Sequence, residues 1–465
     1  MKKIDHLIAL WCTLFVLLTL LSPESGGQNP NSRFALLESM STEHSFHIDR
    51  FTHWGDDWAR TPGPAGHYYS NKAPGAAFWA FPIYKILHPL FGSSKIDETH
   101  PPSFAYKQLV TLLTQTIPYA LISFFLLRAL VLNFSLSLSA TLWGTVALLF
   151  GNTAVIFAGT FFGHTLTAFF LLTALLFSFQ KKFIAFGFFL GFALLSEYTM
   201  ALVVPLFLLL PLFVETEKQQ RLLALLKCAL GGVIPGALWC WYHTLCFGYP
   251  WLTAGSFQNP IFLDVKHLDH NIAGLFSWWP IPWDIGAELL IGGRRGLLFT
   301  NPWILLLMVI SLVLFIKLKR NNRHLLLMVI TFGSTLLLLL MNMSFGGWHA
   351  GASAGPRYLC ALFPLWAIVG ALLYDKIVLF STPLKISLWI TLSVAVIVRG
   401  AILATTVLAP HEEWLWSWLY HNFTLAKSST PLVRFCLYLS LFTALFLYSK
   451  RSEKSGRHSS FQGFK

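Results

Sequence analysis

Three carboxylates lie close together in a stretch rich in Gly, Trp, Tyr and His between residues 48 and 75. Asp49 comes first, and Asp56 and Asp57 follow it in the same polar segment. A carboxylate beside a substrate can accept a proton from an attacking hydroxyl as a general base, or it can hold a divalent metal. The alternative is a turn or helix cap, for which aspartate is well suited. The candidate catalytic residues are therefore Asp49, Asp57 and Asp56.

Four cationic residues stand where apolar stretches begin or end. Lys72 and the pair Arg294 and Arg295 each precede an apolar run, and Arg357 follows a segment of Gly, Ala and Ser. A lysine at the membrane boundary neutralises a lipid phosphate, and the guanidinium fork of arginine matches phosphate oxygens. Such long side chains can also be simple interfacial anchors. We take Lys72 and Arg357 as the leading phosphate ligands, with Arg295 and Arg294 as the second candidates.

Further polar residues flank these positions. His67, Tyr68 and Tyr69 precede Lys72 and can line a pocket for a sugar or diphosphate, or belong to an interfacial aromatic belt. His164 and Glu197 lie at the ends of apolar stretches, at similar depth. A carboxylate at that depth is costly unless it is paired or functional. Both residues are candidates for the pocket or a metal contact, and a structural hydrogen bond is the alternative.

The ligands of a metal ion cannot be assigned from the sequence. The chain has 16 His but no H-x-x-x-H spacing, and His267 and His270 flank Asp269 without a further ligand at zinc-site spacing. This group is more typical of a structural role. The sequence therefore leaves a divalent metal as an unassigned cofactor, for which no ligand residues are named.

The elements that must position these residues are transmembrane helices. The chain has 465 residues, 55% of them hydrophobic and 11% charged, whereas a soluble domain carries about 25% charged residues. The mean hydropathy is +0.62. Disorder, a coiled coil and a disulfide-stapled secreted domain are excluded, because most of this apolar surface must face lipid.

We predict an all-α, polytopic integral membrane protein with about twelve transmembrane helices, because apolar stretches of about 18–25 residues can cross the hydrocarbon core. Two of the stretches, 183–197 and 199–214, are short enough to be tilted, broken or re-entrant. The predicted spans are 6–22, 105–131, 135–158, 162–180, 183–197, 199–214, 222–246, 296–316, 324–344, 357–374, 386–408 and 430–448.

The basic residues predict the orientation. More than half of the 33 Lys and Arg fall in the loops of one side, which places both termini in the cytoplasm of a multi-pass inner-membrane protein. The net charge of +13 then reflects topology and anionic headgroups, so no nucleic-acid partner is needed. The first apolar stretch lacks an A-x-A-like cleavage site, which favours an uncleaved helix over a signal peptide.

A large first extracytoplasmic loop, residues 23–103, contains two apolar segments too short or interrupted to span. The segments 32–40 and 74–91 predict interfacial helices. Any chemistry is therefore expected on the external face. We divide the chain into a core at 1–375, additional C-terminal transmembrane helices at 376–448 and a basic cytoplasmic tail at 449–465.

Several phrases resemble the C-type membrane glycosyltransferases, which include the protein O-mannosyltransferases, the lipid A aminoarabinose transferases and their bacterial relatives. Residues 66–75 are similar to the tyrosine-lysine-proline element before the second interfacial helix, and Ser32-Arg33-Phe34-Ala35 resembles the start of the first. Further matches are Phe162-Gly163-His164, Ser196-Glu197-Tyr198, Leu245-Cys246-Phe247-Gly248-Tyr249-Pro250, Arg295-Gly296-Leu297, Gly346-Gly347-Trp348 and Gly355-Pro356-Arg357-Tyr358-Leu359.

The resemblance implies transfer of a sugar from a polyprenyl-phosphate or diphosphate donor to an extracytoplasmic lipid, glycan or protein acceptor. In this family an acidic residue usually begins the first interfacial helix, but here the place reads Asn29-Pro30-Asn31-Ser32-Arg33. Asn31 cannot accept a proton from a hydroxyl. Either another carboxylate is the base, or the donor is activated without one, or the protein is inactive.

We therefore expect a glycosyltransferase in which Lys72 and Arg357 hold phosphate and Asp49 or Asp57 is the base. Two alternatives stay open. A transporter or flippase for a lipid-linked or polar solute would carry ionisable groups near the bilayer midplane and show two related halves. A non-catalytic glycolipid-binding protein is favoured by Asn31.

Overall fold

The computed structural model describes residues 2–22, 27–63, 66–91, 96–262, 282–317, 323–345, 347–380, 382–405, 413–424 and 429–461. The group His267, Asp269 and His270 lies outside them.

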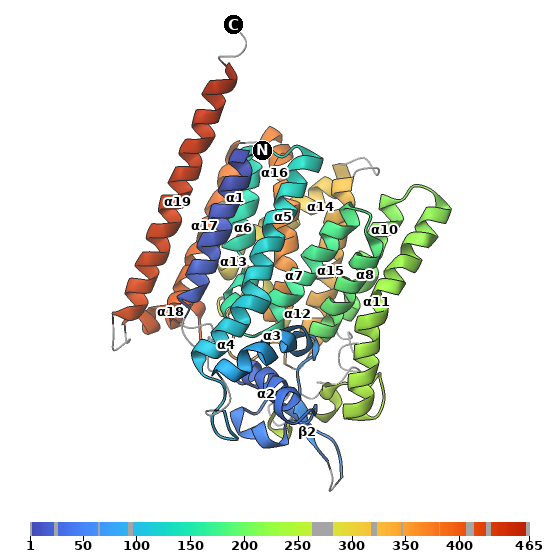
Figure 1. Ribbon diagram of the computed structural model, residues 1–465. Helices are drawn as coiled ribbons and strands as arrows, with labels where there is room; N and C mark the ends of the chain where they lie inside the picture. The colour runs from blue at the N-terminus through green and yellow to red at the C-terminus, as the bar shows by residue number, and fades with distance from the viewer. Residues whose placement is uncertain are drawn as a thin grey trace.

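Helices form nearly all of the regular structure, so the all-α prediction is confirmed (Figure 1). The α-helices are α1 (Lys2–Leu20), α2 (Gln28–Thr42), α3 (Gly75–Phe91), α4 (Phe104–Thr111), α5 (Ile117–Phe134), α6 (Leu138–Leu149), α7 (Gly163–Phe179), α8 (Phe183–Ser196), α9 (Val204–Phe207), α10 (Leu209–Val214), α11 (Lys218–Phe247), α12 (Trp283–Ile291), α13 (Leu297–Thr300), α14 (Pro302–Lys317), α15 (Arg323–Ser344), α16 (Phe363–Phe380), α17 (Thr382–Thr405), α18 (Leu415–Thr424) and α19 (Thr430–Phe461).

Short elements connect them. A π-helical turn, η2 (Leu112–Thr116), joins α4 to α5. The 3-10 helices are η1 (Asp49–Trp54), η3 (Thr153–Gly159), η4 (Tyr198–Leu202), η5 (Ala254–Phe257), η6 (Pro260–Phe262) and η8 (Arg357–Leu362), and the two strands are β1 (Trp58–Arg60) and β2 (Tyr68–Ser70).

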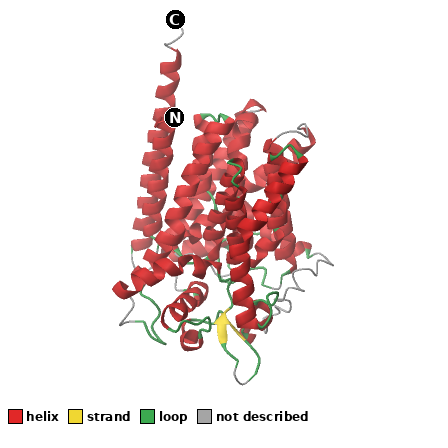
Figure 2. Ribbon diagram, turned by 45° about the vertical axis from the view of Figure 1, so that its right-hand side comes forward, coloured by secondary structure: helices red, strands yellow, loops and turns green. Residues whose placement is uncertain are grey.

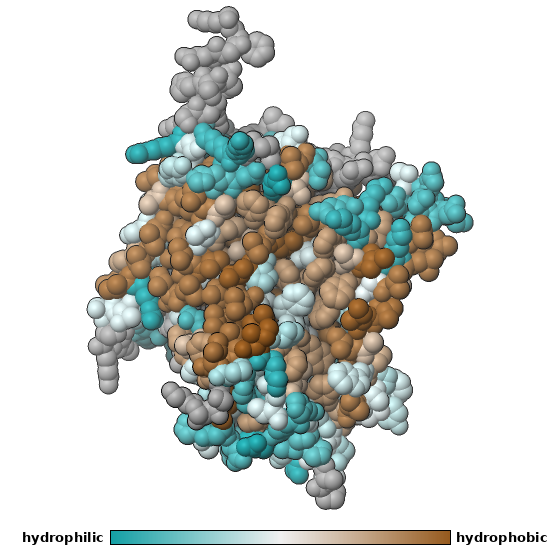
Figure 3. All heavy atoms as spheres, viewed as in Figure 1, coloured by the Kyte–Doolittle hydropathy of each residue, from teal (hydrophilic) through white to brown (hydrophobic). Residues whose placement is uncertain are grey.

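Within the described residues, seven helices are long and apolar enough to cross a membrane, or eight if α6 and η3, bent by 55°, form one span. Four further apolar helices are shorter. The predicted stretch 199–214 is divided among η4, α9 and α10. The protein is thus a multi-pass membrane protein, while the count of twelve spans stays a prediction. Brown, apolar residues cover the middle of the bundle in Figure 3, and hydrophilic residues gather at its two ends.

Both predicted interfacial helices are present at one end of the bundle, and both chain termini lie at the other end (Figure 1). Residues 32–39 of α2 are all buried, because α2 packs against α3, η1 and β2, while α3 lies against α7 and α8. Phe34 of α2 packs against Phe161 with ring centroids 4.8 Å apart. The first loop is therefore a packed part of the fold that can hold side chains in fixed positions.

A buried carboxylate joins the two interfacial helices. Glu38 of α2 accepts a hydrogen bond from the Tyr84 hydroxyl of α3 at 2.5 Å, and Nε2 of His88 lies 3.1 Å from the same carboxylate. Glu38 and Tyr84 are 3% and 0% exposed. A buried carboxylate needs such partners, so this contact fixes α2 against α3.

An antiparallel hairpin lies beside these helices (Figure 2). Strand β1 pairs with β2 in the register Trp58–Ser70, Ala59–Tyr69 and Arg60–Tyr68. Ala59 also forms a bridge to Gln258, which follows α11, and the backbone N–H of the next residue, Asn259, donates to the Trp58 carbonyl at 3.1 Å. The hairpin is therefore joined to the segment after α11.

Candidate active site

The hairpin brings Asp57 and Lys72 together. Asp57 precedes β1 and Lys72 follows β2, so the strand register places them at the same end, where Nζ of Lys72 lies 3.0 Å from Oδ1 of Asp57. Asn71 donates its side-chain amide to the same carboxylate at 3.3 Å. The Ser32 hydroxyl donates to the Asp57 carbonyl at 2.5 Å, which attaches the hairpin to α2.

A second ion pair joins α2 to the end of α8. Nη2 of Arg33 lies 3.5 Å from Oε1 of Glu197, and Nδ1 of His164 lies 3.4 Å from the same oxygen. Arg33 also donates to the Ala73 carbonyl at 3.1 Å, and its Nε donates to the Asn29 side chain. Buried charges are stable when they are paired and hydrogen-bonded in this way.

Gly163 allows the close approach of Glu197. A Cβ atom at position 163 would lie 2.2 Å from Oε1 of Glu197 and 3.0 Å from Nη2 of Arg33. Gly163 is also the first residue of α7, so the carboxylate lies beside the partly positive end of that helix. In the sequence Phe162-Gly163-His164, Gly163 thus leaves room for the Glu197 carboxylate, and the adjacent His164 pairs with it.

Arg357 begins η8 and is the third cation at this place. Its charge acts on Lys72, Glu197 and His164, so all four side chains share one neighbourhood. The guanidinium carbon lies 5.4 Å from the ring centroid of Phe162, a distance at which a cation is attracted to an aromatic face. We call Arg33, Asp57, Lys72, His164, Glu197 and Arg357 the polar cluster.

Arg357 differs from the other two cations in its partners. Lys72 pairs with Asp57 and Arg33 pairs with Glu197, but across the described part of the chain no carboxylate lies within ion-pair distance of Arg357. Its buried Nε has no hydrogen-bond partner there either. The polar cluster therefore has one more cation than carboxylates, and Arg357 is the cation that has no carboxylate partner among the described residues.

The pKa of Lys72 reflects this excess. Burial lowers the pKa of the Lys72 ammonium group from its ordinary value, and Asp57 opposes the shift, while Arg357 and Arg33 lower the pKa further. Burial likewise lowers the pKa of Arg33. An anion entering the polar cluster would relieve this repulsion among cations.

Arg295 and Arg294 occupy different environments. Arg295 is buried, and both terminal guanidinium nitrogens donate to the Gly351 carbonyl at 3.2 Å. Burial, together with the nearby charge of Arg357, lowers the pKa of Arg295 to about 10. Its bonds hold the loop that leads into Arg357, so Arg295 has a supporting position. Arg294 is exposed.

The remaining loop candidates lie apart from the polar cluster. Asp56 is exposed and accepts from the Gln28 amide at 2.9 Å. Asp49 accepts from the Tyr68 backbone N–H at 2.7 Å, and its other oxygen lies 2.6 Å from Nδ1 of His67. Of the three aspartates, Asp57 is the one that pairs with a polar-cluster cation.

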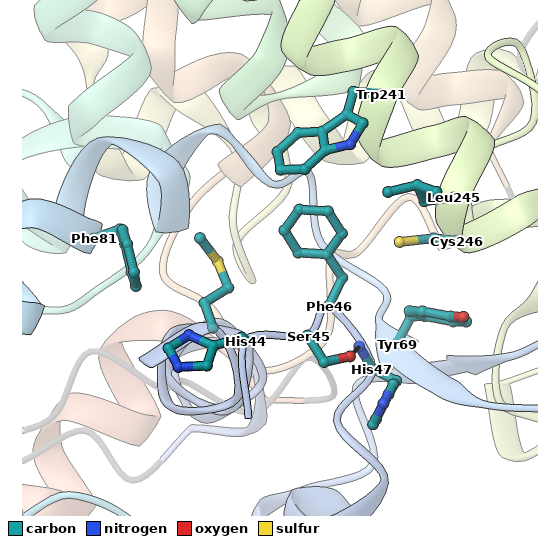
Figure 4. A pocket seen from close by; sticks show the side chains of 10 residues that line it. His44, Ser45, Phe46, His47, Tyr69, Phe81, Trp241, Leu245 and Cys246 are labelled. Atoms are coloured by element: carbon teal, nitrogen blue, oxygen red, sulfur yellow. Dashed lines mark hydrogen bonds between the residues drawn. The ribbon is translucent and has the colours of Figure 1, made fainter. Parts of the chain in front are cut away.

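Tyr69 lines a mainly apolar pocket of about 440 Å³ between the turn that follows α2, α3 and α11. Figure 4 shows Trp241, Leu245 and Cys246 entering it from α11, with Phe46 pointing towards Trp241 at a ring-centroid distance of 4.8 Å. The pocket is also lined by Met40, His44, Ser45, His47 and Phe81. Tyr68 lies outside this lining and stacks edge-on against Trp58.

Sequence reasoning did not assign a role to Arg33. In the sequence, Arg33 stands out only as the one charged residue in the first ten residues of the helix, 28–37. The structure also accounts for Asn31. Its amide donates to the Trp54 carbonyl at 2.9 Å, and its oxygen accepts from Lys107 at 3.0 Å. This residue is therefore engaged in structural hydrogen bonds.

No protein-family model matches the sequence, and no curated protein matches it. Among solved structures, the chain is similar to ArnT from Cupriavidus metallidurans, whose crystal structure has undecaprenyl phosphate bound. The alignment has 12% identity and a TM-score of 0.49, and it covers 98% of this chain and 78% of that chain.

Proposed function

We propose that this protein is a glycosyltransferase that moves a sugar from a polyprenyl-phosphate or diphosphate donor to an extracytoplasmic lipid, glycan or protein. The observation that carries the proposal is Arg357, a cation without a carboxylate partner among the described residues, next to the pairs Lys72–Asp57 and Arg33–Glu197. An arginine of this kind suits a phosphate, because its fork binds two oxygens at once.

The position of the polar cluster fits a lipid-linked donor. It lies where α2, the hairpin, the start of α7 and η8 meet, at the end of the apolar bundle. A polyprenyl chain would stay in the hydrocarbon region while its phosphate reaches this boundary. Lys72 and Arg357 would then hold the phosphate, and the sugar would extend towards the hairpin.

The reaction breaks the bond between the anomeric carbon and the phosphate oxygen. An acceptor hydroxyl forms the new bond to that carbon, the polyprenyl phosphate leaves with the electron pair, and the hydroxyl proton passes to a base. We assign the base to Asp57, because phosphate would attract Lys72 and free the carboxylate for the acceptor. Arg33 keeps Glu197 engaged, so Glu197 is assigned to positioning.

The transporter alternative depends on ionisable groups within the bundle. Arg399 of α17 is such a group, and it is 1% exposed. The rings of Phe15, Phe150 and Tyr438 surround its guanidinium at 5.0–5.7 Å. Aromatic enclosure of this kind favours a packed cation over a residue of a solute path.

The experiment is mass spectrometry of envelope lipids and glycans from cells with and without the protein. Loss of one glycan modification, restored by the wild-type chain but not by Arg357→Ala, would support the transferase. Unchanged glycoconjugates in the deletion strain, together with no binding of polyprenyl phosphate by the purified protein, would reject it.

We also propose that the polar cluster faces the outside and both termini face the cytoplasm of the inner membrane. The termini lie at the end of the bundle opposite α2, α3 and the hairpin (Figure 1). The location of the termini therefore determines on which side of the membrane the polar cluster lies. Alkaline phosphatase fused to the C-terminus should be inactive, whereas the same enzyme inserted at residue 63 should be active. The reverse pattern would overturn the orientation.

A further inference from the structure

A second group of ligand-type side chains lies outside the polar cluster. His47 follows α2, Asp49 begins η1 and His67 precedes β2, and one ligand atom from each lies within 4.8 Å of the others. Nδ1 of His47 is 3.3 Å from Oδ2 of Asp49, and Nδ1 of His67 is 2.6 Å from the same oxygen. The two imidazole rings stack with centroids 4.7 Å apart.

We propose that His47, Asp49 and His67 form a binding site for a divalent metal ion of the Zn²⁺ type. Two imidazole nitrogens and one carboxylate oxygen are a common ligand set for this ion. Ligand atoms at about 2.0–2.2 Å from a tetrahedral ion lie roughly 3.3 Å from one another. The His47–Asp49 distance already has this value, and the His67–Asp49 distance would open slightly on binding.

The hydrogen bonds around Asp49 support a prepared site. The backbone N–H of Tyr68 donates to Oδ1 at 2.7 Å, which leaves Oδ2 directed at the two histidines. Nδ1 of His47 lies beside Oδ2 but makes no hydrogen bond within the described part of the chain. An ion between them would satisfy this buried nitrogen, and the bond from Tyr68 would orient the carboxylate as outer-shell partners do in metal sites.

The site is accessible. The side chains of His47, Asp49 and His67 are 35%, 34% and 50% exposed, so an ion can enter and keep water in its remaining positions. His47 also lines the 440 Å³ pocket, which places the ion at the pocket rim. A bound ion would connect the turn after α2, η1 and β2, and so fix the hairpin that carries Lys72.

The proposal is independent of the transferase function, because metal binding is measured without donor or acceptor. Full-length protein in detergent is stripped with EDTA, and binding of Zn²⁺ is followed by calorimetry and by metal analysis after gel filtration. We expect one Zn²⁺ per chain in the wild type. His47→Gln and His67→Gln should each weaken binding by about 100-fold or more.

His100→Gln is the matched control, since this exposed histidine also pairs with an aspartate, Asp97, but no second histidine joins them in the part of the chain that the structure describes. Its Zn²⁺ affinity should equal that of the wild type. If His47→Gln and His67→Gln bind Zn²⁺ as the wild type does, or if the wild type takes up no stoichiometric Zn²⁺, the proposal is overturned. Gel-filtration profiles show whether each variant is folded, and Asp49→Asn provides a third variant if one is not.

Discussion

The ammonium nitrogen of Lys72 lies 3.0 Å from Oδ1 of Asp57, and the two residues flank opposite strands of one hairpin. The proposed phosphate ligand and the proposed base are thus partners before any substrate arrives. A phosphate that attracts Lys72 would weaken its hold on Asp57. Donor binding and activation of the base are therefore coupled through one ion pair.

Substitution of this pair should separate binding from chemistry. Lys72→Ala removes a charge-assisted contact worth about 1.5–3 kcal/mol, so the Kd for polyprenyl phosphate should rise about 10- to 100-fold. Asp57→Asn should leave the Kd within a few-fold but slow transfer by about 10²–10⁴, the usual contribution of a general base. Binding and single-turnover assays on purified protein measure the two effects.

Lys181→Ala is the control for that pair, because Lys181 is an exposed lysine that pairs with Glu215 at 2.9 Å. It should bind donor as the wild type does. Equal donor affinity in Lys72→Ala and Lys181→Ala would remove Lys72 from the phosphate site.

Donor binding should weaken at alkaline pH. The pKa of Lys72 is lowered by burial and by Arg357 and Arg33, so its ammonium group loses its proton at a lower pH than an ordinary lysine does. Phosphate prefers the protonated form and would raise this pKa again, so binding takes up a proton and the Kd rises with pH through the lowered pKa. Lys72→Arg should flatten this rise. A Kd that is independent of pH from neutral to alkaline in the wild type would contradict the assignment.

Arg357 should depend on its fork as well as its charge. Arg357→Ala should raise the donor Kd by about 10- to 100-fold, and Arg357→Lys should recover only part of this loss, because lysine cannot bind two oxygens at once. Arg60→Ala is the control, since Arg60 is exposed on the hairpin beside Tyr68. Full recovery by lysine would reduce the role of Arg357 to charge alone.

A methyl group at position 163 should disturb Glu197. Gly163→Ala places Cβ 2.2 Å from Oε1 of Glu197, so we expect a lower melting temperature, a loss of about 1–3 kcal/mol, and weaker transfer. Gly232→Ala is matched, because nothing lies within 4 Å of a Cβ there and alanine favours the helix. Equal melting temperatures for the two variants would show that the Glu197 carboxylate can move away from position 163 without loss of stability.

The Tyr84 hydroxyl should stabilise the packing of α2 against α3. Tyr84→Phe leaves buried Glu38 without one hydrogen bond, so the expected loss of stability is about 1–3 kcal/mol. Tyr249→Phe, at an exposed position, should change stability by less than about 0.5 kcal/mol. Thermal unfolding in detergent compares the two. Identical curves would mean that His88 alone satisfies Glu38.

The sequence predicted the helices well because a bilayer requires long apolar runs. The stretch 222–246 corresponds to α11, Lys218–Phe247. The helix begins four residues earlier than predicted, because its first turn contains Lys218 and Arg221 and is not apolar. The stretch 199–214 was predicted from its length to be tilted, broken or re-entrant, and it is divided. Pro205 lies in α9 and Pro211 in α10, and Pro211 has no N–H with which to continue the helix from α9.

The polar cluster was less predictable, because its pairs join distant parts of the chain. Arg33 and Glu197 become partners only when α2 packs against the end of α8, and no local pattern indicates this contact. Likewise, the spacing of Asp49 and Asp57 does not say which one faces Lys72. The strand register decides that, and a two-stranded hairpin of three residues each leaves little signal in the sequence.

The bridge between Ala59 and Gln258 has a consequence for biosynthesis. About 200 residues separate Ala59 from Gln258, and ribosomes add about 5–20 residues per second. Gln258 is therefore synthesised on the order of 10–40 s after the hairpin with which it pairs. During that interval Trp58 and its neighbours are already translated but lack their final contacts. Arrested nascent chains that stop before Gln258 should therefore leave this region open to protease, and chains released beyond it should protect the same peptide bonds.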